Sequence, residues 1–150
     1  MRRKEREIST QEAMGILKKV EYGILSIASL NGKPYGVPLN YCVLNDAIYF
    51  HCAAAGMKLD ILAENHSVSF CAVGETEVLA ETFGMKYESA VVSGYAQEVT
   101  GSEKQMALEG LVKKYSQRYF DKGLGVIKKD FDRTRVFKIN IHSISGKARR

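Results

Sequence analysis

Three segments decide the fold: Tyr35-Gly36-Val37-Pro38-Leu39-Asn40-Tyr41, then Tyr49-Phe50-His51-Cys52, then Gly56-Met57-Lys58-Leu59. The first two predict a pair of neighbouring strands. The third predicts the start of a short helix, where free backbone N–H groups and a partial positive charge suit a phosphate. Asn40 and His51 are the polar ends of the two strands, beside an aromatic and apolar wall. Together the segments predict a site for a flat ring that carries a phosphate tail.

The residues before and between these segments predict a helix followed by hairpins. Ser9 and Glu12 form a Ser-x-x-Glu capping box at the start of a helix. Asn31-Gly32 predicts a tight turn between a strand that begins at Tyr22 and the strand Tyr35 to Val43. A third strand is expected over Ala47 to Cys52.

The second half of the chain predicts two further helices and three more strands. A helix is expected over 53–64, with Asn65 ending it in the left-handed conformation. The later expectations are a strand over 67–73, a surface loop over 74–86, a strand over 88–99 with a bulge at Gly94, a helix over 103–119, a charged connection over 121–133 and a strand over 134–144. This order predicts a small closed β-barrel of about six strands, flanked by helices.

Composition predicts one globular domain over residues 1–150. The chain is 45% hydrophobic and carries a net charge of +5, with much of the excess in the basic runs 2–4, 128–129 and 147–150. No basic stripe interleaved with aromatic residues accompanies these ends, so we expect no nucleic-acid partner. No apolar run approaches the roughly 20 residues of a membrane span, and the three cysteines lack a Cys-x-x-Cys pair. We therefore expect a cytoplasmic protein with no membrane partner and no structural metal.

Several short motifs, taken together and in order, resemble the nitroimidazole-resistance family. This family lies within the pyridoxamine-phosphate-oxidase-like flavin-binding split barrels. The resemblance covers roughly residues 9 to 147. Its landmarks are Glu21-Tyr22-Gly23-Ile24-Leu25-Ser26, Tyr35-Gly36-Val37-Pro38-Leu39, Ile48-Tyr49-Phe50-His51-Cys52-Ala53, Gly56-x-Lys58-Leu59-Asp60, Lys86-Tyr87-Glu88-Ser89 and Ile144-x-Gly146-Lys147.

The resemblance implies a six-stranded split barrel that forms a homodimer, with FMN in clefts at the dimer interface. It implies that the backbone of the second strand passes along the flavin ring, that Lys58 holds the phosphate, and that Ser89 approaches the flavin from its own or the partner subunit. His51 and Cys52 would end the third strand beside the ring. The second-strand residues meant here are Val37, Pro38, Leu39 and Asn40.

Three positions depart from the pattern of true pyridoxamine-phosphate oxidases. Tyr35 and Asn40 stand where those enzymes place basic residues, and Met57 stands where a basic residue usually precedes the phosphate lysine. The missing positive charge disfavours the oxidation of pyridoxamine phosphate itself. It also leaves open a ligand other than FMN.

Two functions follow from the residues and the resemblance. The first is a flavin-dependent oxidoreductase that reduces small acceptors such as nitroaromatic or nitroimidazole compounds, with His51 as the candidate catalytic residue, which could pass a proton near neutral pH. The alternative is a non-catalytic flavin- or haem-binding protein that uses the same cleft, with His51 as the axial ligand of the haem. Cys52 is read as a packed thiol rather than a reactive one.

Overall fold

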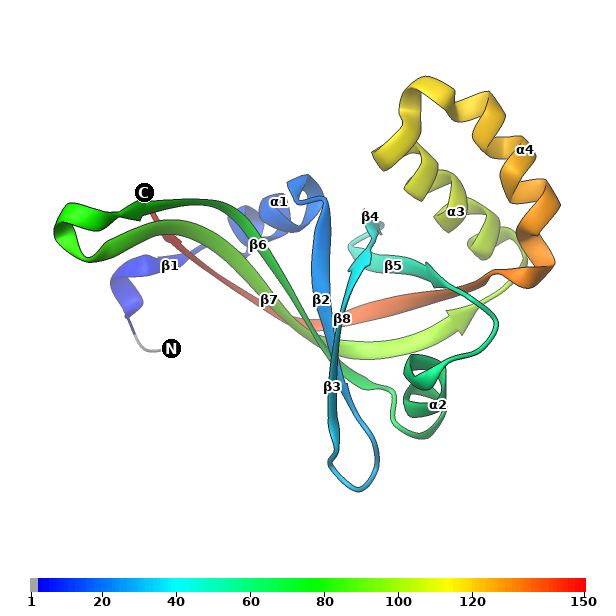
Figure 1. Ribbon diagram of the computed structural model, residues 1–150, viewed down its shortest axis with the longest axis horizontal. Helices are drawn as coiled ribbons and strands as arrows, with labels where there is room; N and C mark the ends of the chain where they lie inside the picture. Colours follow the sequence, from blue (N-terminus) through cyan, green and yellow to red (C-terminus); the bar gives the residue numbers. More distant parts are fainter. Residues whose placement is uncertain (1–2) are drawn as a thin grey trace.

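The structure is a computed structural model that describes residues 3–150, so Met1 and Arg2 of the basic N-terminal run lie outside it. One curved antiparallel sheet runs in the order β3-β2-β6-β7-β8-β5-β4, with β1 beside β8 (Figure 1). The strands are β1 (Glu7–Ile8), β2 (Tyr22–Ala28), β3 (Pro34–Asn40), β4 (Cys42–Leu44), β5 (Ala47–Cys52), β6 (Ser67–Leu79), β7 (Gly84–Val99) and β8 (Arg135–Arg149). The α-helices are α1 (Thr10–Lys19), α2 (Met57–Glu64), α3 (Gly101–Ser116) and α4 (Phe120–Asp130). Four 3-10 turns are η1 (Lys4–Arg6), η2 (Ala80–Thr82), η3 (Gln117–Tyr119) and η4 (Phe131–Arg133). The six strands with at least six residues form a half-barrel, as expected for the split barrel that the resemblance implies, whereas the closed barrel predicted from the order of elements is wrong because β3 and β4 do not pair.

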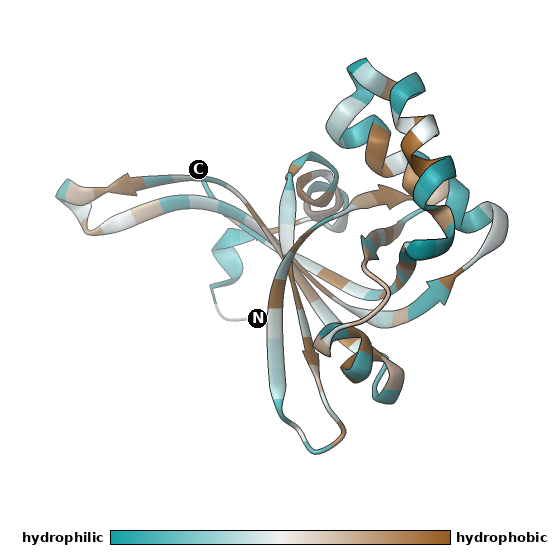
Figure 2. Cartoon of the chain, turned by 45° about the vertical axis from the view of Figure 1, so that its right-hand side comes forward, coloured by the Kyte–Doolittle hydropathy of each residue, from teal (hydrophilic) through white to brown (hydrophobic). Residues whose placement is uncertain are grey.

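Two hydrophobic clusters fill the molecule, and β5 supplies side chains to both. Phe50 belongs to the cluster inside the half-barrel and stacks on Phe137, with ring centroids 5.6 Å apart. Tyr49 belongs to a second cluster between the sheet and the α3–α4 pair. The split follows from the strand geometry, because successive side chains point to opposite faces. Figure 2 shows the hydrophobic residues in the strands where they cross at the centre of the sheet.

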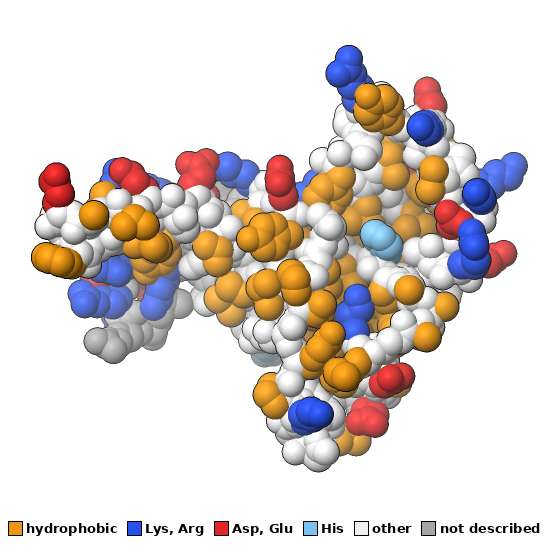
Figure 3. Space-filling model, viewed as in Figure 1, with side chains coloured by type: hydrophobic (Ala, Val, Ile, Leu, Met, Phe, Trp, Pro, Cys, Tyr) orange, Lys and Arg blue, Asp and Glu red, His pale blue; other side chains and the backbone are white. Residues whose placement is uncertain are grey.

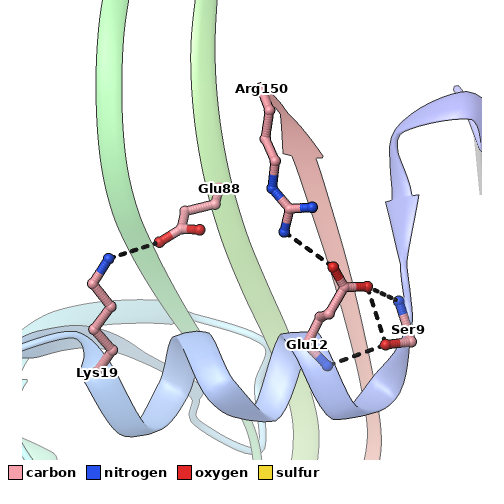
Figure 4. Close-up of polar contacts among 5 residues, drawn as sticks. All are labelled: Ser9, Glu12, Lys19, Glu88 and Arg150. Atoms are coloured by element: carbon pink, nitrogen blue, oxygen red, sulfur yellow. Dashed lines mark hydrogen bonds and ion pairs between the residues drawn. The ribbon is translucent and has the colours of Figure 1, made fainter.

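The predicted capping box at the start of α1 is confirmed (Figure 4). The Ser9 hydroxyl accepts from the Glu12 amide at 3.2 Å, and the Glu12 carboxylate accepts from the Ser9 amide at 3.1 Å. Arg150 donates to the other Glu12 oxygen at 3.0 Å, which joins the C-terminal end of the chain to α1. Lys19, in the last turn of α1, lies 3.8 Å from the Glu88 carboxylate of β7. Both ends of α1 are therefore anchored to the sheet.

The predicted strand from Tyr35 to Val43 is broken at Tyr41. The part before the break pairs with β2, and the part after it pairs with β5. The hydroxyl of Tyr115 on α3 accepts from the Tyr41 amide at 2.9 Å and lies 2.8 Å from the Tyr41 carbonyl. This hydroxyl also donates to the carbonyl of Glu21. A side chain from α3 thus takes the hydrogen bonds that a continuous strand would have made.

The expected surface loop over 74–86 is wrong. These residues extend β6 and β7 into a long hairpin, called the arm here (residues 75–87), which reaches away from the half-barrel (Figure 1). Glu77 pairs with Lys86 across the arm, with their charged atoms 3.1 Å apart. The register shifts between Val73 and Thr76. That irregularity and the exposure of both faces removed the simple alternation by which a strand is recognised.

The expected connection over 121–133 is also wrong, because it contains α4 and η4. α2 begins at Met57 rather than at Ala53. Asn65 ends α2 in an extended conformation with φ −138°, not in the left-handed one. Its side chain instead donates to the Ala28 carbonyl at 2.9 Å, which ties the helix end to β2. The bulge expected at Gly94 is confirmed, since the β7–β8 register shifts between Ser93 and Gly94.

Candidate functional site

The N-terminus of α2 has the features of an anion site. Gly56 precedes the helix with φ 144°, and none of the residues 3–150 provides a side-chain cap for this end. The first amides to bond back to the Gly56 carbonyl are those of Leu59 and Asp60, at 2.9 and 3.2 Å. The amides of Met57 and Lys58 come before them and are therefore available to a ligand. A Cβ at Gly56 would meet no atom within 4 Å, so there is open space beside these amides.

Lys58 places a positive charge beside these amides. Its Nζ lies 5.6 Å from the centre of the Phe50 ring, so the ammonium group sits against the end of β5. A lysine in the first helical turn opposes the helix dipole by roughly 0.3–1 kcal/mol. An anion bound at this end would reverse that penalty and use both the amides and the charge.

β3 contacts β5, the strand that precedes α2 in the chain. Within the described residues, β3 pairs only with β2, so its other edge presents free backbone groups. Along β3 the burial alternates: Val37 and Leu39 are half-buried, whereas Pro38 and Asn40 are exposed. Asn40 donates to the Glu21 carbonyl at 3.3 Å, which holds the end of β3 against the start of β2. The free N–H and C=O groups along this edge can hydrogen-bond to a flat polar ring and orient it.

His51 lies on the other face of β5 from Phe50 and lines a groove below α3 and α4. None of the described residues hydrogen-bonds to its imidazole. His51 is exposed in the single chain, yet desolvation by the groove lowers the pKa of His51, and the nearby Lys58 charge lowers this pKa further. His51 is therefore neutral at neutral pH, with one ring nitrogen able to donate and the other able to accept.

Cys52 is half-buried and packs against the cluster inside the half-barrel. Desolvation raises the pKa of its thiol, and this effect outweighs the opposing influence of Lys58 and Arg135. Arg135 is itself held by Glu98 through two hydrogen bonds of 2.8 and 2.6 Å. The Cys52 thiol thus stays protonated near neutral pH, which agrees with the packed role expected from the sequence.

Ser89 is the one predicted site residue that the structure does not bring to this region. It pairs with Lys147 near the arm, whereas His51 pairs with Val136, which in turn pairs with Val99 at the far end of β7. Ser89 and Val99 are ten positions apart on one strand, or about 33 Å along it at about 3.3 Å per residue. Ser89 and His51 of one chain therefore cannot touch the same ring.

Sequence reasoning missed the residues that surround His51 from the helical side. The groove walls include Leu108 and Leu111 of α3 and Val126 and Ile127 of α4. Because residues 121–133 were predicted to be a connection, the α4 side of this groove was not expected. A usable signal was present nonetheless, because Phe120, Leu124, Ile127 and Phe131 recur at helical spacing.

These residues fit a ring with a phosphate tail. The α2 amides and Lys58 suit the phosphate, beside the open space at Gly56, and the free edge of β3 suits the ring. No α-helix within residues 3–150 has the length and apolar character that a membrane crossing requires.

Comparisons with known proteins agree with this geometry. The family model described as pyridoxamine 5'-phosphate oxidase matches residues 9–148. No curated protein matches the chain.

Three solved structures illustrate the fold. A candidate 5-nitroimidazole antibiotic resistance protein from Bacteroides thetaiotaomicron is 24% identical with a TM-score of 0.79, and the match covers 94% of this chain and 85% of that one. An FAD-binding protein from Mesorhizobium loti is 23% identical with a TM-score of 0.68, covering 97% and 98%. The FAD and haem binding protein from Mycobacterium smegmatis is 16% identical with a TM-score of 0.83, covering 95% and 73%. These structures share the split-barrel fold, and the chain belongs to the pyridoxamine 5'-phosphate oxidase family.

Proposed function

We propose that this protein is a homodimeric, FMN-dependent oxidoreductase that reduces small acceptors such as nitroaromatic or nitroimidazole compounds. The observation that carries the proposal is the open N-terminus of α2, with Lys58 against the end of β5, a strand that also contacts β3. The solved relatives named as flavin-binding and as a candidate nitroimidazole-resistance protein support this reading.

The protein's own part in the reaction is binding, orientation and proton supply. Lys58 and the amides of Met57 and Lys58 hold the phosphate, and the backbone of Val37 to Asn40 orients the ring. FMN, when bound, supplies the two-electron redox chemistry. Neutral His51 can donate a hydrogen bond from one nitrogen and accept a proton on the other, which suits it to a reaction in which an acceptor gains protons along with electrons.

The homodimer is proposed from an exposed apolar surface and from the position of Ser89. Ile24, Cys71 and Val91 are cross-strand neighbours on the outward side of β2, β6 and β7. Together with Tyr22 and Val73 they form what we call the outer face. Figure 3 shows hydrophobic side chains gathered along the arm and over the middle of the molecule.

Tyr22 is 61% exposed, Val73 52% and Val91 42% in the single chain. Apolar surface of this extent is typical of an interface. A second copy would also bring its Ser89 to a flavin that the first copy's own Ser89 cannot reach.

The test of the function is a flavin-loading and reoxidation experiment. Purified protein is incubated with FMN, or separately with FAD, and desalted, and its visible spectrum is recorded. The bound flavin is then photoreduced without oxygen and mixed with 2-methyl-5-nitroimidazole. The proposal predicts retained flavin and return of the oxidised spectrum; protein that retains no flavin, or whose reduced flavin ignores the nitro compound, contradicts it.

The dimer has its own test. Light scattering after size exclusion should give twice the 16.7 kDa mass of one chain. Val91→Glu on the outer face should shift the protein toward the monomer, because a buried unpaired charge is costly. A wild-type mass of one chain would contradict the dimer.

A haem-binding role is the second candidate, because His51 is neutral and free of hydrogen bonds to the residues the structure describes. A neutral imidazole is the form that ligates haem iron. Haem added to the purified protein should then give a Soret band that His51→Ala removes; a band that survives this substitution rules His51 out as the ligand.

A further inference from the structure

The groove between α3, α4 and the end of β5 is large enough for a small ligand. Its volume is about 510 Å³, within the usual range for small-molecule sites. We call it the helix pocket. It is lined by His51, Leu108, Leu111, Val112, Ser116, Tyr119, Lys122, Gly123, Val126, Ile127, Asp130 and Thr134.

The walls of the helix pocket are apolar and firmly placed. Leu111 and Ile127 are 7% and 6% exposed and belong to the second hydrophobic cluster. α3 and α4 touch at Gly123, where an added Cβ would come within 2.5 Å of Val112. Val126 on α4 is 53% exposed and borders the opening. The pocket is therefore the unfilled side of a packed cluster rather than a gap between mobile segments.

Most polar groups of the helix pocket already have partners or lie at its rim. The Asp130 carboxylate pairs with Arg133, and the Thr134 hydroxyl donates to the Asp130 carbonyl at 2.9 Å. Lys122 is exposed to solvent. His51 lines the pocket from β5, and its ring, like the exposed hydroxyls of Ser116 and Tyr119 on the helical side, has no hydrogen bond to any residue in 3–150. Desolvation in the groove lowers the pKa of His51.

We propose that the helix pocket binds a small, uncharged, largely apolar molecule that carries one hydrogen-bonding group directed at His51. Apolar walls disfavour an ion, since a charge buried without a partner is expensive. Lys122 is exposed to solvent at the rim and the Asp130 carboxylate is already paired with Arg133, so neither offers a buried charge with which to select an ion. One polar group in an otherwise apolar site fixes the orientation of its ligand.

The pocket also suggests where the proposed reaction takes place, and this step rests on the proposed function. His51 follows Phe50 on β5, and the Nζ of Lys58 lies 5.6 Å from the centre of the Phe50 ring. A molecule held against His51 therefore lies next to the region assigned to the flavin. Its occupant is then the electron acceptor, and an aromatic nitro compound has the size and polarity required.

The binding test needs no cofactor. The neutral fluorescent amine N-phenyl-1-naphthylamine is titrated into flavin-free protein, and 2-methyl-5-nitroimidazole is used to displace it. Val126→Trp should fill the opening and weaken the dye by about tenfold or more. Lys129→Trp adds the same side chain to the same helix outside the pocket, where Lys129 is exposed and makes no hydrogen bond or ion pair with a described residue, and should bind like the wild type. Circular dichroism checks that each variant is folded.

A third variant tests the polar contact. His51→Phe keeps a flat ring and removes both nitrogens, so the dye should still bind while the nitro compound loses about fivefold in affinity, the value of one neutral hydrogen bond. No dye binding by the wild type, or equal binding by Val126→Trp and Lys129→Trp, overturns the pocket. Unchanged displacement in His51→Phe overturns the role of His51.

The two proposals can fail separately. If the protein retains no flavin but the wild type binds the dye and Val126→Trp does not, the pocket is supported and its role as the acceptor site is contradicted. A flavin-loaded enzyme whose KM for the nitro compound is the same in Val126→Trp and wild type keeps the function and overturns the pocket as the acceptor site.

Discussion

Replacing Tyr115 with phenylalanine tests how α3 is joined to the sheet. The Tyr115 hydroxyl accepts from the Tyr41 amide at 2.9 Å and lies 2.8 Å from the Tyr41 carbonyl, at the break between β3 and β4. Tyr41 is fully buried. Tyr115→Phe keeps the ring and its packing, so the change removes only the hydroxyl and leaves the Tyr41 amide without its partner.

The expected loss in the free energy of unfolding follows from the unpaired amide of Tyr41. Leaving a buried donor unsatisfied costs about 1–3 kcal/mol. Tyr115 is 37% exposed, so water can reach part of the site and replace some of the lost bonding. We therefore expect the free energy of unfolding to fall by about 1–2 kcal/mol, the lower part of that range.

The assay is urea unfolding followed by circular dichroism at one fixed protein concentration, because dimerisation would make stability depend on concentration. Tyr119→Phe is the matched control: Tyr119 is 62% exposed, and no hydrogen bond joins it to another described residue. The control should stay within about 0.5 kcal/mol of the wild type. A Tyr115→Phe variant as stable as this control would refute the reasoning.

Four further substitutions have expected outcomes that urea unfolding can check. Gly125→Ala should stabilise α4 by about 0.5–1 kcal/mol, since the added Cβ would meet no atom within 4 Å. Gly123→Ala should destabilise the protein, because its added Cβ would collide with Val112. A change in the free energy of unfolding with the same sign in both variants would contradict the α3–α4 packing. Ser9→Ala should cost about 1 kcal/mol through loss of the capping box, and an unchanged midpoint would argue against that cap. The wild type should lose more stability than His51→Phe between pH 7.5 and 5.5, because the lowered pKa of His51 means that the unfolded chain takes up a proton more readily than the folded chain. The contribution of His51 to stability is fully present above the ordinary histidine pKa and is lost as the pH falls. Equal losses of stability in the two proteins would contradict this prediction.

Local signals in the sequence predicted the fold where the structure obeys local rules. The capping box at Ser9, the hairpin turn at Asn31-Gly32 and the bulge at Gly94 each depend on residues that are neighbours in sequence or directly opposed on the next strand. The break at Tyr41 could not be read in the same way. It depends on the hydroxyl of Tyr115, which is 74 positions away in the sequence.

The arm escaped prediction for a different reason. Both of its faces are exposed: Val78 is 68% exposed and Phe83 99%. A strand with no buried face shows no alternation of apolar and polar residues. Its pairing is held instead by backbone bonds and by contacts such as Glu77 with Lys86, which a hydrophobic pattern does not record.

The candidate site was predicted in part. The glycine and lysine predicted at a helix start do stand at the start of α2, because a glycine before a helix is a local signal. Anion binding at this end stays a prediction. The position of His51 relative to the α3–α4 pair depended on recognising α4, whose glycines and lysines resemble a connection. The separation of Ser89 from His51 depends on the pairing of β5 with β8 and of β8 with β7, which a hydrophobic pattern does not record.

The most direct test of the account is the affinity of FMN for the wild type and for Lys58→Ala, measured by quenching of FMN fluorescence on addition of flavin-free protein. The account predicts saturable binding by the wild type and an affinity about 10–100-fold lower in Lys58→Ala, the value of one charge-assisted hydrogen bond. Lys129→Ala, with the same loss of charge on α4, should match the wild type. A wild type that binds no FMN, or a Lys58→Ala variant that binds it as tightly as Lys129→Ala, would contradict the account.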